Sequence, residues 1–163
     1  MKTTIVEREF LEYIKTMADI IREPILMLDE DLRVIVANES FYRTFQVELK
    51  ETEGKIVYAL GNGQWDIPAL RKLLEDILPK NTFFKGFEVI HEFPVIGRKI
   101  MILNARRIDS KKFQSIILLA MEDMTEMMII AETLAGQANR DALQVSNALK
   151  LRNALERGAA SSL

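Results

Sequence analysis

The sequence predicts an α+β fold in which a five-stranded antiparallel sheet carries helices on one face. Three observations predict it: strand-like runs come in groups joined by hairpin-length connections, the segments between them have helical periodicity, and amphipathic helical segments flank the whole. We expect an N-terminal amphipathic helix over residues 1–22, the sheet domain over 23–123, a coiled-coil helix over 124–158 and a disordered tail over 159–163.

The N-terminal part predicts a helix, a hairpin and a second, short helix. Between residues 5 and 21, apolar side chains recur at steps of three and four, so one helix face must be buried somewhere. Pro24 ends this helix, and two strand-like runs follow, joined by a charged turn at 29–31. Asn38 is suited to cap the short helix that comes next. The apolar face of the first helix consists of Phe10, Ile14, Met17 and Ile21.

The second half predicts one longer helix and three strands. The helix begins at Pro68, with Asp66 as its capping carboxylate, and ends at Pro79. The last strand is apolar at odd and even positions alike, so both of its faces must be covered. The three strands span 84–93, 98–108 and 113–121, with connections at 94–97 and 109–112.

The last strand runs into a helix with no loop between them. Asp123 and Glu126 stand three residues apart, which predicts a capping box in which Asp123 caps the helix and Glu126 reaches back to it. Beyond the cap, apolar residues have the 3.5-residue period of a two-helix seam. The seam is mostly alanine and buries little area, so at about 25 cal/mol per Å² it is weak. The predicted dimer seam is Met128, Ala131, Ala135, Ala138, Ala142, Val145 and Leu149.

This order of elements resembles a PAS domain with its C-terminal signalling helix, as in bacterial sensor histidine kinases and chemotaxis methyltransferase–methylesterase fusions. The stretches that carry the resemblance are "REPILMLDEDLRVIVANESFYRTF", the Gly54 turn, "FEVIHEF", "KIMILNARRI" and "IILLAMEDMTE". Asp123-Met124-Thr125 stands where such domains carry Asp-Ile-Thr. The resemblance implies a small cavity between sheet and helices, a homodimer formed by the flanking helices, and signal relay through Asp123, Thr125 and Glu126.

Three residues are candidates for lining a ligand cavity. Trp65 precedes the longer helix and either stacks on a flat ligand such as a flavin or anchors its loop in the core. Asn104 and Arg106 share one face of a strand, and they either orient a ligand or solvate an edge, depending on where that face points. His91, the sole histidine, is expected to be a half-buried structural residue. Four methionines predict adaptable packing, with a Cu(I) site as the alternative: Met121, Met124, Met127 and Met128.

Composition excludes several classes of function. The net charge of −2 gives no field that gathers nucleic acid or anionic membrane, and the absence of cysteine excludes disulfides and thiolate chemistry. No run approaches the roughly 18 apolar residues of a membrane span. No histidine-based triad or paired carboxylate predicts an enzyme.

We therefore expect a cytoplasmic PAS sensing, relay and dimerisation module that acts on an effector domain of the same protein. A small-molecule ligand is compatible with this expectation, and no cofactor is the favoured expectation. The alternatives are a flavin- or haem-loaded redox or gas sensor and a ligand-free dimerisation module. The blue-light flavin subclass is excluded because its photochemistry needs a cysteine, which the chain lacks.

Overall fold

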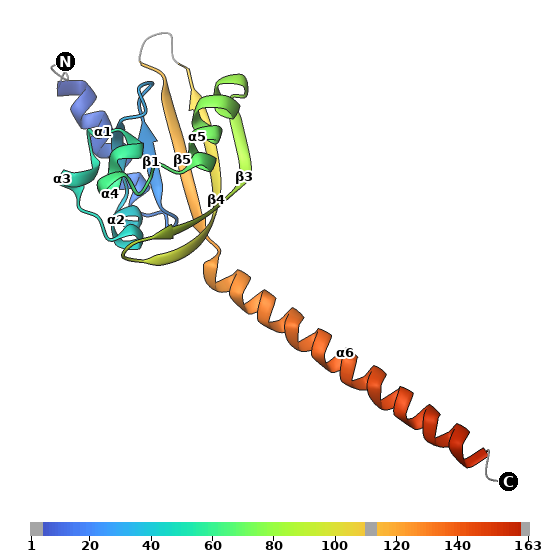
Figure 1. Cartoon of the computed structure of the whole chain (residues 1–163). Coiled ribbons are helices and arrows are strands. Elements are labelled where there is room, and N and C mark those ends of the chain that lie inside the picture. Colours follow the sequence, from blue (N-terminus) through green and yellow to red (C-terminus); the bar gives the residue numbers. More distant parts are fainter. Residues whose placement is uncertain (1–4, 110–113, 161–163) are drawn as a thin grey trace. The chain divides into compact units, whose positions relative to one another are not determined.

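The computed structural model describes residues 5–109 and 114–160, and the chain divides into two units after Thr125. The first unit is built on a five-stranded antiparallel sheet with strand order β2-β1-β5-β4-β3 (Figure 1). This confirms the predicted α+β fold. The strands are β1 (Ile25–Leu28), β2 (Val34–Ala37), β3 (Phe83–Phe93), β4 (Gly97–Ile108) and β5 (Ile116–Asp123).

Short helices connect the two halves of the sheet and cover one of its faces, and a longer helix stands at each end of the described chain (Figure 1). The terminal helices are α1 (Ile5–Ala18) and α6 (Thr125–Ala160), the latter reaching two residues past its predicted end. The connecting elements are α2 (Glu39–Phe45), α3 (Leu49–Thr52), the 3-10 turn η1 (Val57–Ala59), α4 (Leu60–Gly63), α5 (Pro68–Arg71), the π-helical η2 (Lys72–Ile77) and the 3-10 turn η3 (Leu78–Lys80).

The predicted hairpin forms between β1 and β2, and the side chain of Asp29 shapes its turn. Asp29 Oδ1 accepts hydrogen bonds from the backbone N–H of Asp31 (2.9 Å) and Arg33 (2.8 Å). Leu32 takes a left-handed conformation, with φ of 61°. The Asp29 carboxylate thus accepts from N–H groups two and four residues later in the chain. These bonds take the place of strand-to-strand hydrogen bonds, which the turn cannot make.

Asn38 caps α2 as predicted, and it also does more. Its Oδ1 accepts hydrogen bonds from the backbone N–H of Phe41 (3.0 Å) and Ile25 (2.8 Å). Its Nδ2 donates to three backbone carbonyls between the last residue of α1 and the start of β1, and the whole residue is buried. One side chain therefore joins the end of α1, the start of β1 and the start of α2. The three carbonyls belong to Ala18 (3.0 Å), Ile21 (3.3 Å) and Glu23 (2.9 Å).

The helical segment from Pro68 to Lys80 differs from its prediction in two ways. Asp66 does not cap it: the N-cap position is Ile67, without a side-chain bond, and Asp66 instead pairs with Arg71 (Oδ1 to Nε, 2.5 Å). The guanidinium is the stronger partner because the interaction is charge-assisted. The middle of the segment is also a π-helix, which the local sequence does not predict. The segment packs on the core through Leu70, Leu73 and Leu74, which are buried.

The core lies between the short helices and the inner face of the sheet, and the outer face is only partly covered. In β5 the inward residues Ile117, Leu119 and Met121 are buried, whereas the outward Leu118 and Ala120 are half-buried. The expectation that both faces of β5 are covered is therefore met fully on the inner face and in part on the outer face. β5 also begins at Ile116, later than predicted. Residues 110–113, which comprise most of the predicted connection and the predicted first residue of the strand, lie outside the described residues.

Both terminal helices leave apolar side chains exposed in a single copy of the chain. On α1, Phe10 is 63% exposed and Met17 is 61% exposed, although their stripe was expected to be buried. The predicted seam of α6 is exposed along its length except for the half-buried Met128. Residues 161–163 of the predicted tail lie outside the described residues.

Candidate functional site

The point where β5 passes into α6 is held by a set of polar contacts that we call the junction latch. Asp123 Oδ2 accepts from Lys99 Nζ (2.7 Å), and Asp123 Oδ1 accepts from the backbone N–H (3.0 Å) and the hydroxyl (2.5 Å) of Thr125. Thr125 Oγ1 in turn accepts from the backbone N–H of Ile100 (2.9 Å), and Met124 N–H donates to Ile100 O (2.8 Å). The exit of β5 is thus bound to β4 by side chain and backbone together.

The latch depends on the charge of Asp123. Burial alone would raise the pKa of this carboxyl, but hydrogen bonds from Lys99 and Thr125 outweigh it and lower the pKa below its ordinary value. Asp123 is therefore ionised at neutral pH. The predicted return contact from Glu126 stays a prediction, and Glu126 is exposed.

Lys99 is a residue of the junction latch that sequence reasoning missed. In the sequence it is one half of a basic pair with Arg98, with nothing that links it to Asp123. The link comes from strand register: Met101 lies opposite Asp123 across the β4–β5 ladder, and Lys99 lies two residues before Met101, on the same face of β4. A single sequence does not predict which residue of β4 lies opposite which residue of β5, because apolar residues alternate along both strands and several pairings fit the pattern.

Trp65 lies in the core, not in an open cavity. It is 1% exposed, and its ring packs against Phe41 (centroids 5.4 Å apart), Phe45 (4.6 Å) and Phe93 (5.5 Å). The second of its two expected roles, anchoring its loop, is the one the structure supports. A flavin or haem placed here would have to displace this aromatic cluster, so the residues do not fit such a group as they stand.

The aromatic core leaves two buried polar atoms among the described residues without a hydrogen-bond partner. They are the indole Nε1 of Trp65 and the hydroxyl of Tyr58. Burial, ahead of the nearby Glu75 carboxylate, raises the pKa of Tyr58, so the phenol stays protonated. Unpaired buried polar groups are uncommon in proteins, because burying them without a partner costs free energy.

Asn104 and Arg106 lie on the outer face of β4, opposite the core that holds Trp65. The three predicted cavity residues therefore do not share one cavity. Asn104 Oδ1 accepts from the N–H of Gly86 (3.0 Å), which has a φ of 72° in a β-bulge of β3. The backbone conformation at this bulge favours glycine, and Asn104 satisfies its N–H.

Both residues instead line a groove of about 540 Å³ between α1 and the outer face of the sheet, which we call the outer groove. Its walls are mostly apolar: Ile14, Met17 and Ile21 come from the helical side, and Met27 and Leu118 belong to those from the sheet. The cations along it are Lys85 and Arg106.

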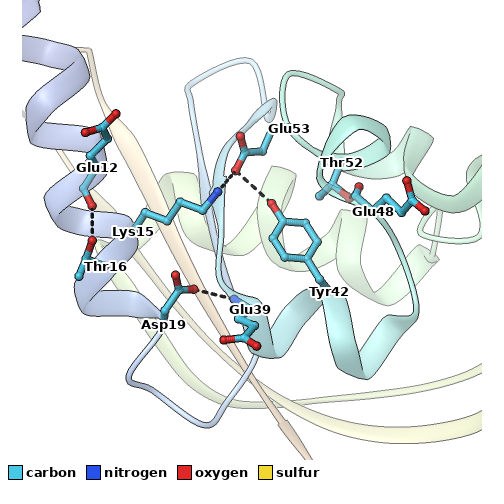
Figure 2. A network of polar contacts seen from close by, with 9 residues as sticks. All are labelled: Glu12, Lys15, Thr16, Asp19, Glu39, Tyr42, Glu48, Thr52 and Glu53. Carbon is cyan, nitrogen blue, oxygen red and sulfur yellow. Dashed lines mark hydrogen bonds and ion pairs between the residues drawn. The ribbon is translucent and has the colours of Figure 1, made fainter.

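Polar contacts hold α1 in place beside the outer groove (Figure 2). Glu53 Oε1 pairs with Lys15 Nζ (3.3 Å) and accepts from the hydroxyl of Tyr42 (3.0 Å), and Asp19 Oδ1 accepts from the N–H of Glu39 (2.7 Å). Burial and then the Glu53 charge raise the pKa of Tyr42, so it remains a donor. The position of α1 is thus defined by one ion pair and by hydrogen bonds of Asp19 and Asn38.

His91 is a half-buried residue of β3, as expected, and its ring packs edge-on against Phe93 (4.7 Å between centroids). Within the described residues, no group of three histidine or acidic side chains lies close enough to hold a metal ion. None of the described helices combines the length and apolar composition that a membrane span requires.

This architecture is that of the PAS fold, and comparison with solved structures confirms it. A PAS domain from a two-component sensor histidine kinase is similar to the chain with a TM-score of 0.54 and 10% identity, covering 72% of this chain and 98% of that one. The PAS domain of BvgS from Bordetella pertussis gives a TM-score of 0.52 at 18% identity, covering 80% and 97%. The LOV protein of Rhodobacter sphaeroides gives 0.58 at 14%, covering 72% and 69%.

No protein-family model and no curated relative matches the sequence. The chain therefore has the PAS fold, which confirms the resemblance drawn from its sequence at the level of fold.

Proposed function

We propose that the chain is the sensing and relay module of a larger cytoplasmic signalling protein. In this proposal, the PAS-fold unit responds to a signal and Asp123-Met124-Thr125 passes a change in the sheet to α6. The module has no catalytic activity of its own and acts on an effector domain of the same protein.

The junction latch is the observation that carries this proposal. β5 ends at Asp123 and α6 begins at Thr125, so a single residue separates a core strand from a 36-residue helix. Because Thr125 accepts from Ile100 N–H, a shift of β4 against β5 changes the contacts of the first residue of α6. Such a joint transmits a displacement that a flexible loop would absorb.

Hydrogen exchange of Thr125→Val tests the latch. Valine has the shape of threonine without the hydroxyl, so the N–H of Ile100 loses its acceptor and should exchange about threefold to tenfold faster. The matched control is Thr133→Val, in which an exposed helical threonine loses only its bond to the carbonyl of Ile129 (2.8 Å). Equal exchange of Ile100 in both variants would contradict the latch.

The relay itself is tested by placing the chain in heptad register ahead of the catalytic domains of a histidine kinase. A Gly-Gly-Ser insertion after Thr125 uncouples the strand from the helix, and we expect the output to stop responding to changes in the PAS-fold unit. An output that still responds after the insertion would refute the relay proposal, but it would not contradict the contacts of the junction latch.

We further propose that the module is a homodimer formed through its flanking helices. The exposed stripe of α1 and the exposed seam of α6 both lack a partner within one copy, and burying apolar surface drives association. The small side chains of the seam allow two helices to approach closely.

A ligand-free dimerisation module is the second candidate, and the packed aromatic core around Trp65 favours it. The absorption spectrum of the purified protein, followed by mass spectrometry of molecules released on denaturation, separates the candidates. A flavin or haem band supports a loaded sensor. An empty, colourless protein supports the ligand-free module or a sensor of weakly bound molecules.

A further inference from the structure

The outer groove has the size and composition of a ligand site, although it lies on the face of the sheet opposite the core. Its volume of about 540 Å³ falls within the range of small-molecule pockets, roughly 300–1,000 Å³. Such pockets are mostly apolar with a few polar groups that orient the ligand. The walls of the outer groove follow that description.

Its charged residues are all of one sign. Lys85 and Arg106 line the groove, and no carboxylate does. Within the part of the chain that the structure describes, neither cation makes an ion pair. An anionic group at this position would gain charge-assisted hydrogen bonds without breaking an existing pair.

The fold sets these cations in place. Arg106 lies between Phe83 and Leu118 across the two ladders of β4, so it rises from an apolar surface. Lys85 lies in the β-bulge that Asn104 stabilises through Gly86, and a bulge re-aims the side chains beside it. Asn104 thus acts as a positioning residue.

We propose that the outer groove binds an amphipathic monoanion: an unbranched aliphatic chain against Met17, Ile21 and Leu118, with its carboxylate at Lys85 and Arg106. The apolar walls account for the chain, and the unpaired cations account for the acid. This site goes beyond the relay proposed above and does not depend on it, because ligand binding and exchange at Ile100 are separate measurements. It assigns Met17 and Ile21 to the ligand, so the proposed homodimer then rests on Phe10 of α1 and on the seam of α6.

Titration calorimetry of the full chain with decanoate, below its aggregation concentration, tests the site. We expect one decanoate per chain. Decylammonium, with the same chain and the opposite charge, should bind at least tenfold more weakly. Hexanoate, which is four methylenes shorter, should also bind more than tenfold more weakly, since each buried methylene contributes to affinity.

Two variants with a matched control locate the carboxylate. Arg106→Gln should weaken decanoate binding about threefold to tenfold. Arg98→Gln removes the same charge from the same strand, about 26 Å away on the same face and outside the groove, and should leave binding unchanged. Met17→Glu places a carboxylate on the helical wall and should abolish binding; the exposure of Met17 makes loss of folding no concern.

Three results would overturn the proposal. Decanoate affinity equal in the Arg106 and Arg98 variants would remove the anion site. Equal binding of decylammonium would reduce the interaction to unspecific adsorption. Failure of decanoate to bind at all, with Met17→Glu converting a dimer to a monomer in sedimentation, would identify a second copy of the chain as the occupant.

Discussion

The side chain of Asn38 connects three backbone segments by hydrogen bonds. It is buried, and its amide group makes five hydrogen bonds to backbone atoms of three segments. Both ends of the amide are needed, because Oδ1 accepts from two N–H groups while Nδ2 donates to carbonyls. An aspartate of the same shape keeps the acceptor and loses the donor.

We expect Asn38→Ala to lower the free energy of unfolding by about 3 kcal/mol, because it leaves buried backbone groups without partners. Asn38→Asp should be comparably destabilising at pH 7, since it sets a buried carboxylate against carbonyl oxygens. The control is Asn81→Ala, whose exposed side chain donates only to Ile77 O (2.9 Å) and should cost below about 1 kcal/mol. Denaturant unfolding measures all three. A loss below about 1 kcal/mol for Asn38→Ala would show that water replaces its bonds.

Asp123 makes the latch sensitive to acid. Its pKa is lower in the folded protein than in the unfolded chain, so its contribution to stability is present above the unfolded value of about 3.9 and is lost as pH falls through the folded value. Asp123→Asn should destabilise by about 1 kcal/mol at pH 7. We expect this difference to stay constant from pH 8 to 5 and to shrink below pH 4, as followed by unfolding at each pH. A difference that persists undiminished at pH 2 would rule out the carboxylate as its source.

At the scale of elements, the hairpin, the five strands and the cap of α2 followed from sequence because each rests on local chemistry. Asp29 binds backbone within four residues, Asn38 caps α2 through the N–H of Phe41 three residues on, and strand alternation is a local pattern. The other bonds of Asn38 reach α1 and β1 and could not be predicted locally. The π-helix of η2 has no local signal in the sequence, and the partner of Asp66 did not follow because a capping carboxylate and an ion pair with Arg71 are both compatible with its position. The sequence also did not predict which face of β4 points to the core, since the alternation that places Asn104 and Arg106 on one face fits either face.

For α6, the seam prediction is tested by two aspartates in place of alanines. Ala142→Asp lies on the seam, where a dimer would bury its charge, and should weaken self-association more than tenfold. Ala154→Asp lies in the same helix off the seam, and both alanines are exposed in a single copy. Sedimentation equilibrium of the two variants and the wild type gives the comparison. Equal weakening by both variants would place the interface elsewhere on α6.

At the scale of the whole molecule, the two units rest on different sources of stability. The first has a core in which Trp65 and its aromatic neighbours are buried, whereas α6 exposes its apolar residues in a single copy. Sequence periodicity shows which faces are apolar but not what covers them, and for this reason the stripe of α1 and the outer face of β5 were expected to be more deeply buried than they are.

This contrast predicts that the two units respond differently to dilution. Helices without tertiary packing are marginal in water, and Gly136 costs α6 roughly 1 kcal/mol relative to alanine. A dimer seam would supply the missing packing, and its contribution depends on protein concentration. The far-UV circular dichroism of helix should therefore fall between about 100 μM and 0.5 μM, while the fluorescence of Trp65 stays constant because its core is complete in one copy.

The seam variants make this experiment decisive. Ala142→Asp should show reduced helix at both concentrations, and Ala154→Asp should follow the wild type. If instead the wild-type helix signal is independent of concentration and equals that of Ala142→Asp, α6 is stable without a partner copy. If Trp65 emission shifts to the red on dilution together with the helix signal, the first unit also needs the dimer in order to fold, and the independence of its core would be refuted.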